Sequence, residues 1–161
     1  MTCCFTGPRP QNLPWSEDDL RCKFLKLRLE IEIRKALESG YRHFISGMAL
    51  GIDLYAAHII LNLRRDRPEL GITLEAAIPC NAQSATWEYH QRIKYNDILL
   101  KCDKRTILSA RATPDCFQKR NEYMVNQSSL IIAVSDGRAG GTMNTIAYAK
   151  QQHKEVIIIK P

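Results

Sequence analysis

The chain has 161 residues, of which 45% are hydrophobic and 25% charged, and its formal net charge is +6. This composition is typical of a soluble globular protein, and no run of about 18 apolar residues could span a bilayer. The opening MTCCFTG lacks the basic region and apolar stretch of a signal peptide, so we expect a cytoplasmic protein with no membrane partner. The positive charge favours an anionic partner but names none.

Short apolar runs alternate with helical patterns along the whole chain. Near the amino end, Ser16 and Asp19 have the spacing of a capping box, and Leu20, Phe24, Leu27 and Ile31 recur at helical spacing until Gly40. The same reading, continued along the chain, predicts strands at 2–6, 41–46, 72–79, 104–109, 129–135 and 155–160 and helices at about 16–39, 51–66, 84–100, 117–126 and 141–152.

Apolar strands separated by helices predict a parallel sheet that is covered on both faces. We therefore expect an α/β protein with a three-layer, doubly wound Rossmann-like fold, a mainly parallel sheet of about six strands, and a single domain over residues 1–161. Cys3 and Cys4, adjacent in the first strand, should point to opposite faces of the sheet. The six cysteines include no C-x-x-C pair, so neither a zinc site nor a redox motif is predicted.

In such a fold the ligand lies beyond the carboxyl ends of the strands, so functional residues should follow strands. The loop SGMALGID follows the second strand and contains Ser46, Gly47, Gly51 and Asp53. Its glycines would let a phosphate approach the backbone near a helix amino end. The alternative interpretation, equally consistent with these residues, is a compact turn in which Asp53 caps the helix and nothing is bound. No Gly-Lys-Ser/Thr ending is present, so a Walker loop is not indicated.

The loop SDGRAGGTMNT after the fifth strand predicts phosphate binding more sharply. Gly137, Gly140 and Gly141 lead into Thr142 at a helix start, where a hydroxyl and backbone N–H groups can both reach phosphate oxygens. Arg138 could add a charge-assisted contact.

Two further segments add cations near the expected ligand edge. TGPRP places Thr6, Gly7 and Arg9 after the first strand, with Arg9 either an anion ligand or a surface charge. Lys119, Arg120 and Asn121 begin a helix, where two cations oppose the positive end of the dipole, which hints at an anion between them.

Together these segments resemble a known family. ISGMALGIDLYAAH, KRNEYMVNQSSLIIAV and AGGTMNTIAYAKQQHKEVIIIKP are similar to the Rossmann domain of DNA-processing protein A, the single-strand DNA loader of natural transformation. The order of elements is also similar to LOG-type phosphoribohydrolases, so the chain resembles the SLOG superfamily. Its short length and CFTGPRP start look most like the stand-alone YpsA-like proteins often found in prophages. The resemblance implies a homodimer.

The match to LOG enzymes is incomplete at the residues that do chemistry. Arg120 stands four residues before Met124, as in those enzymes, but Thr145 occupies the place of their glutamate, three residues after Gly141 and Thr142. Pro8 also replaces a histidine that relatives carry in the first loop. Without the carboxylate, no group is evident to stabilise an oxocarbenium-like centre or to activate water.

We therefore expect a nucleotide or nucleotide-derivative binding or sensing protein, with no assigned catalytic residue, no metal and no certain cofactor. The alternatives are single-stranded DNA binding and N-glycosidic hydrolysis of a nucleotide. The residues predicted to bind ligand or phosphate are Thr6, Gly7, Arg9, Ser46, Gly47, Gly51, Asp53, Arg120, Asn121, Gly140, Gly141 and Thr142.

Overall fold

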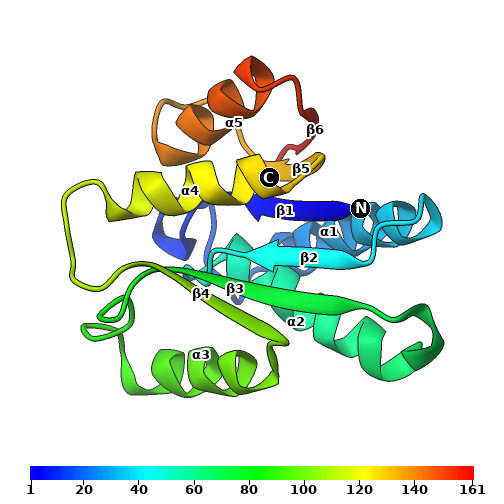
Figure 1. Ribbon diagram of the computed structural model, residues 1–161, viewed down its shortest axis with the longest axis horizontal. Coiled ribbons are helices and arrows are strands. Elements are labelled where there is room, and N and C mark those ends of the chain that lie inside the picture. The colour runs from blue at the N-terminus through cyan, green and yellow to red at the C-terminus, as the bar shows by residue number, and fades with distance from the viewer.

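The computed structural model describes residues 1–161 and contains a six-stranded, wholly parallel sheet with helices between the strands (Figure 1). The Rossmann-like α/β architecture predicted from the sequence is confirmed. The strands are β1 (Thr2–Thr6), β2 (His43–Ser46), β3 (Thr73–Cys80), β4 (Lys104–Ser109), β5 (Leu130–Val134) and β6 (Glu155–Ile159). The helices are α1 (Leu20–Glu38), α2 (Ile52–Asp66), α3 (Tyr89–Lys101), α4 (Cys116–Gln127) and α5 (Gly141–Gln151), with short 3-10 turns η1 (Pro10–Asn12) and η2 (Pro68–Leu70).

The strand order β4-β3-β2-β1-β5-β6 determines where a ligand can lie. The chain runs outward from β1 to β4 and then returns to the other side of β1 for β5. Cys3 of β1 is therefore in register with both Phe44 of β2 and Leu130 of β5. Beyond the carboxyl ends of β1 and β5 the order reverses, which is the topological switch point where open α/β sheets bind ligands.

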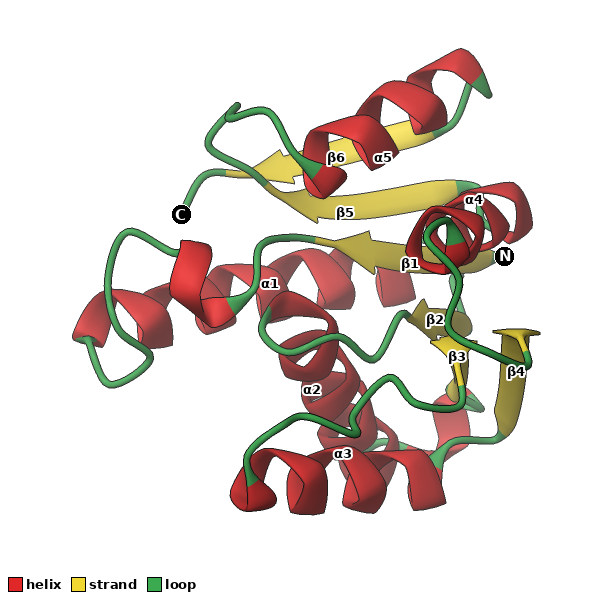
Figure 2. Cartoon of the chain, turned by 90° about the vertical axis from the view of Figure 1, so that its left-hand side faces the viewer, coloured by secondary structure: helices red, strands yellow, loops and turns green.

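The helices form a layer on each face of the sheet (Figure 2). Leu29 of α1 packs in one large cluster with Phe5, to which α2 and α3 also contribute, and Met124 of α4 packs in a smaller cluster with Ile45. Cys3 belongs to the larger cluster and Cys4 to the smaller, so the prediction that they point to opposite faces is confirmed. None of the helices combines the length and apolarity that crossing a bilayer requires.

Two helices begin later than the sequence pattern predicts. The helix predicted from Ser16 starts at Leu20, because the carboxylate of Asp19 accepts a hydrogen bond from the backbone N–H of Arg21 at 2.9 Å and so caps the first turn. The helix predicted from about residue 84 starts at Tyr89, where Glu88 and Gln91 form a reciprocal capping box. Local side-chain caps, not the apolar periodicity, fix both starts.

Glu75 of β3 is buried beneath α4 and is satisfied by side chains from several elements. Tyr123 and Thr106 donate hydrogen bonds to its carboxylate at 2.6 and 2.7 Å, while His43 Nε2 and Lys104 Nζ lie 2.9 and 3.2 Å from it. Burial alone would raise the pKa of Glu75, but the hydrogen bonds from Tyr123, Thr106 and His43 together hold it below its ordinary value of 4.5.

Substitution of Glu75 by Gln should lower the free energy of unfolding by about 2 kcal/mol, because the network loses its charge. The folded pKa of Glu75 is depressed, so its contribution is fully present above pH 4.5 and is lost as the pH falls below that value. Urea unfolding of both proteins from pH 7 to pH 3 measures the difference. Glu69→Gln, which removes an exposed pair with Arg67, is the control and should change little. A difference between wild type and Glu75→Gln that stayed constant across this range would contradict the assignment.

Candidate functional site

Arg120 of α4 is a buried guanidinium that reaches the loop after β2. It is only 5% exposed, and its Nη1 donates to the backbone carbonyl of Gly47 and lies 3.8 Å from Asp53 Oδ2. Its Nε donates to Asn121 Oδ1 at 2.8 Å. The structure therefore brings four predicted site residues into one cluster: Gly47, Asp53, Arg120 and Asn121. Within this cluster the guanidinium already contacts protein groups.

The loop between β2 and α2 is closed by its own polar groups. Ser46 Oγ donates to the backbone carbonyl of Asp53 at 2.9 Å and accepts from the N–H of Met48 at 3.1 Å. Asp53 Oδ2 accepts from the N–H of Ala49 at 3.3 Å. The carboxylate thus holds the turn that precedes α2. It does not cap the helix itself, whose N-cap is Gly51 with no side-chain hydrogen bond.

Internal packing accounts for both glycines of this loop. A β-carbon on Gly47 would lie 2.6 Å from Asp53 Oδ2 and against the guanidinium of Arg120. Gly51 has a φ of +90°, and a β-carbon there would lie 2.6 Å from the carbonyl oxygen of Pro8. A side chain at either position would separate groups that must touch.

Burial opposes the charged form of both members of the Asp53 and Arg120 pair. It raises the pKa of Asp53, an effect that the nearby Arg120 charge and the Ala49 N–H counteract. It also lowers the pKa of Arg120, against which the Asp53 carboxylate acts. Each charge therefore depends on the other to stay ionised in the interior.

Gln83 is a member of this cluster that sequence reasoning missed. It is buried in the loop after β3, and its Nε2 donates to the same Gly47 carbonyl at 3.0 Å. Tyr95 of α3 lies within hydrogen-bonding distance of Gln83 Oε1, at 3.4 Å. A lone glutamine in a loop carries no spacing signal, so only the fold identifies it.

The predicted glycine turn lies in a different place, at an open cleft of about 370 Å³. The cleft lies at the switch point, between the first loop and the start of α5. Gly140, Gly141 and Thr142 line it, and the other lining residues are Pro8, Gln11, Asn12, Leu13, Val134, Ser135, Asp136, Arg138, Ala139 and Pro161. These three, together with Arg138, are the residues predicted to contact phosphate that line this cleft.

The start of α5 has backbone N–H groups without a side-chain partner. Its N-cap is Gly140, and no side chain caps the first turn. Arg138 on the rim is paired with Asp136 at 2.9 Å, and Ser135 Oγ accepts from the N–H of Gly137 at 3.1 Å. The turn is shaped by its own side chains and leaves the helix end open to the cleft.

Thr145 points into the protein instead of the cleft. It is 3% exposed, and its hydroxyl donates to the backbone carbonyl of Gly141 at 2.9 Å. The position that holds a glutamate in LOG-type enzymes is therefore part of the helix interior here. The carboxylate that lines the cleft is Asp136, which is already paired with Arg138.

Arg9 is the exposed cation of the predicted set, and it lies over an aromatic ring. Its guanidinium carbon is 5.6 Å from the ring centre of Phe117, and that of Arg120 is 5.8 Å from the same ring. Phe117 was not predicted as a site residue. Thr6 is buried at the end of β1, and a β-carbon on Gly7 would collide with the side chain of Ile52.

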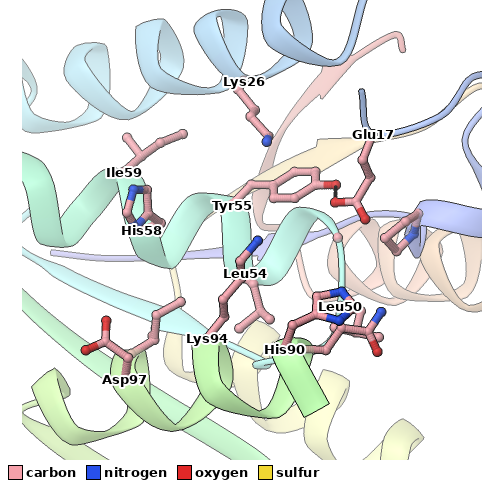
Figure 3. A pocket seen from close by; sticks show the side chains of 14 residues that line it. Glu17, Lys26, Leu50, Leu54, Tyr55, His58, Ile59, His90, Lys94 and Asp97 are labelled. Atoms are coloured by element: carbon pink, nitrogen blue, oxygen red, sulfur yellow. Dashed lines mark hydrogen bonds between the residues drawn. The ribbon is translucent and has the colours of Figure 1, made fainter. Parts of the chain in front are cut away.

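A second cleft of about 370 Å³ lies between α1, α2 and α3, away from the switch point (Figure 3). Lys26 Nζ lies 4.3 Å from the ring centre of Tyr55, whose hydroxyl donates to Glu17. Figure 3 also shows Lys94 directed toward Tyr55. Gly51 is the predicted site residue that lines this cleft, and its polar side chains are exposed or half-buried. Nothing in the sequence pattern indicated it.

Residues 3–159 match the model of the YspA SLOG family. The chain belongs to that family. It is 33% identical over 140 residues to the uncharacterised SPbeta prophage-derived protein YoqJ of Bacillus subtilis, with 80% of each chain covered. It is 27% identical over 135 residues to a UPF0398 protein of Halalkalibacterium halodurans, with 82% of this chain and 70% of that protein covered.

Solved structures with a similar fold include two DNA processing A proteins. The protein from Helicobacter pylori matches 98% of this chain with a TM-score of 0.67, and that from Streptococcus pneumoniae matches 96% with a TM-score of 0.60. Both are 15% identical to it, so the likeness concerns the fold. The chain spans 64% and 49% of these two longer proteins. Within residues 1–161, no His, Cys, Asp and Glu side chains are grouped in threes that could hold a metal ion.

Replacing Arg120 by Met should lower the free energy of unfolding by about 3 kcal/mol, because the Asp53 carboxylate is left buried without its cation. Adding Asp53→Asn should recover part of this loss, since the uncompensated charge is then removed. Urea unfolding of the wild type, both single variants and the double variant measures the coupling. A double variant whose loss equalled the sum of the single losses would show that the two side chains act independently.

Proposed function

We propose that the protein binds a nucleotide or nucleotide-derived ligand in the cleft at the switch point, with phosphate at the start of α5. The observation that carries this proposal is the open, uncapped amino end of α5 in a cleft between β1 and β5. Free N–H groups and the helix dipole together favour an anion at such a position. Thr142, which is half-buried beside them, offers a hydroxyl to the same phosphate.

The remaining lining residues suit the rest of a nucleotide. A volume of about 370 Å³ lies within the range of small-molecule sites. The side-chain amides of Gln11 and Asn12 come from the first loop and can hydrogen-bond to a ribose or base. Arg138 stands on the rim, where it can exchange Asp136 for a phosphate oxygen.

Binding without hydrolysis fits this arrangement better than an N-glycosidase. Glycosidic cleavage commonly uses a pair of carboxylates, one as acid and one as base or nucleophile. Thr145 is buried within α5, and Asp136 is the single carboxylate that lines the cleft. We therefore propose a sensing or binding role, with the buried Arg120 and Asp53 pair acting to hold the adjacent loop in place.

A thermal-shift panel of mononucleotides, cyclic nucleotides, NAD and ADP-ribose tests the site. A true ligand at about 100 times its Kd should raise Tm by roughly 5 °C or more. Gly141→Val should fold normally, because a β-carbon there meets nothing within 4 Å, yet it should abolish the shift by filling the approach to the backbone.

A matched pair of arginine variants separates local contact from net charge. Arg138 and Arg65 are both exposed and each is paired with a neighbouring aspartate. Arg138→Gln should reduce the ligand-induced shift, whereas Arg65→Gln should leave it unchanged. A panel in which no phosphate-bearing compound raised Tm, or a shift that survived Gly141→Val, would refute the proposed site.

Single-stranded DNA binding is the second candidate, and the exposed Arg9 and Phe117 pair favours it. A cation beside an aromatic ring is a common way to hold backbone phosphate and a stacked base. Phe117 is 39% exposed and lies at the same edge of the sheet as the cleft. The fold is also that of the Helicobacter pylori protein, which binds single-stranded DNA.

If this second function holds, a labelled oligothymidylate should bind with an affinity that falls steeply as salt rises. Phe117→Ala should weaken binding about tenfold through lost stacking, and Arg9→Ala should lower the salt slope by about 1. Fluorescence anisotropy over a salt series measures both quantities, with Arg65→Ala as the control. Binding that was insensitive to salt, or equal in all variants, would exclude this function.

A further inference from the structure

Helix α1 has apolar residues on two opposite faces. Leu25, Leu29 and Ile33 are fully buried against the sheet. On the opposite face, four large apolar side chains are exposed to 50–61%: Leu20, Phe24, Leu27 and Ile31. A helix on the surface of a globular protein normally has one apolar face and one polar face. The second face of α1 therefore needs an explanation beyond the fold.

The spacing of the exposed residues is that of a coiled-coil seam. Leu20, Phe24, Leu27 and Ile31 follow one another at intervals of four, three and four residues, which are the d and a positions of successive heptads. The seam is about 16 Å long at 1.5 Å per residue. A stripe this narrow matches a partner helix, whereas a helix that lies in a lipid surface presents a broader apolar face.

The charges beside the seam determine which helix can pack there. One edge carries Arg21, Arg28 and Lys35, at the e positions, and the other carries Lys23 and Glu30, at the g positions. Arg21, Lys35 and Glu30 have partners within α1 or at its cap, while Lys23 and Arg28 have no carboxylate within 4 Å. The edges of the seam are therefore mainly basic and partly uncompensated.

A second copy of the chain fits this seam poorly. In an antiparallel pair of α1 helices, the e positions face each other, so Arg21, Arg28 and Lys35 would lie against the same cations, and on the g side Lys23 would face Glu30, which Arg34 already pairs. In a parallel pair, Lys23 would face Arg28 of the other copy, while Glu30 would face Lys35, and both of these already have partners within α1. Like charges at these positions disfavour pairing. The homodimer that the sequence resemblance implies stays a prediction, and it would use a different surface.

We propose that the exposed face of α1 docks an amphipathic helix of another protein, with apolar residues along its seam and Asp or Glu on both flanks. The partner's apolar side chains cover Leu20, Phe24, Leu27 and Ile31, and its carboxylates meet Lys23 and Arg28. None of these residues lines the switch-point cleft, so the proposal stands apart from nucleotide binding.

The probe is a fluorescein-labelled peptide of three heptads with Leu at a and d and Glu at e and g. Its own like charges discourage self-pairing. Anisotropy at low salt should show binding to the wild-type protein, and at least tenfold weaker binding of the same peptide with Lys at e and g. Phe24→Gln with Leu27→Gln should lose at least tenfold in affinity, and Arg28→Glu should also weaken binding. Leu100→Gln on α3, where Leu100 is 76% exposed, is the matched control and should bind normally.

Four results would overturn the proposal. The first is no binding of the acidic peptide up to about 100 μM. The second is equal affinity for both peptides, or no loss in the double variant. The third is light scattering that finds a wild-type dimer which the double variant loses, making a second copy the occupant. The fourth is sedimentation with phosphatidylserine vesicles that depends on Phe24 and Leu27, making a membrane the occupant. The substituted side chains are exposed, so the variants should fold normally, and an unchanged Tm checks this.

Discussion

The backbone carbonyl of Gly47 is the point where separate parts of the carboxyl edge of the sheet are tied together. Arg120 reaches it from α4 and Gln83 reaches it from the loop after β3. Two donors on one oxygen hold the loop between β2 and α2 against both neighbours. The Arg120 guanidinium also lies beside Asp53, so its buried charge has a carboxylate partner. The buried Gly47 carbonyl in turn accepts the hydrogen bonds that it requires. These contacts hold the edge of the sheet in place beside the open cleft.

This constraint divides the residues of the predicted binding motifs into two kinds. Those of the SGMALGID loop and the KRN helix face one another and leave little surface for a ligand. Those of the glycine turn before α5 face the cleft and leave backbone donors free. A phosphate would meet a preformed turn beside an anchored loop, so little ordering would be required on binding. Thr145 is turned inward, away from the cleft, which supports the proposed binding role over a hydrolytic one.

The sequence predicted the order of elements and the parallel sheet, since these follow from periodicity, and it predicted correctly that the glycine-rich loops follow the carboxyl ends of strands. It did not predict the roles of Arg120 and Gln83, which depend on contacts between residues distant in the chain. The Glu75 network was missed for the same reason. Helical spacing marked Leu20, Phe24, Leu27 and Ile31 correctly as helical, but α1 is apolar on both sides. Spacing alone cannot tell which of two such faces meets the core.

The strand order also has a consequence for synthesis of the chain. β1 is made first, but one of its two neighbours, β5, begins only at Leu130. Until that segment leaves the ribosome, the future central strand is an edge strand with a row of unpaired N–H and carbonyl groups. Its apolar residues on the α4 and α5 side are also uncovered at that stage. The nascent amino-terminal half is therefore the form of this protein most exposed to aggregation, and completion of β5 ends that exposure.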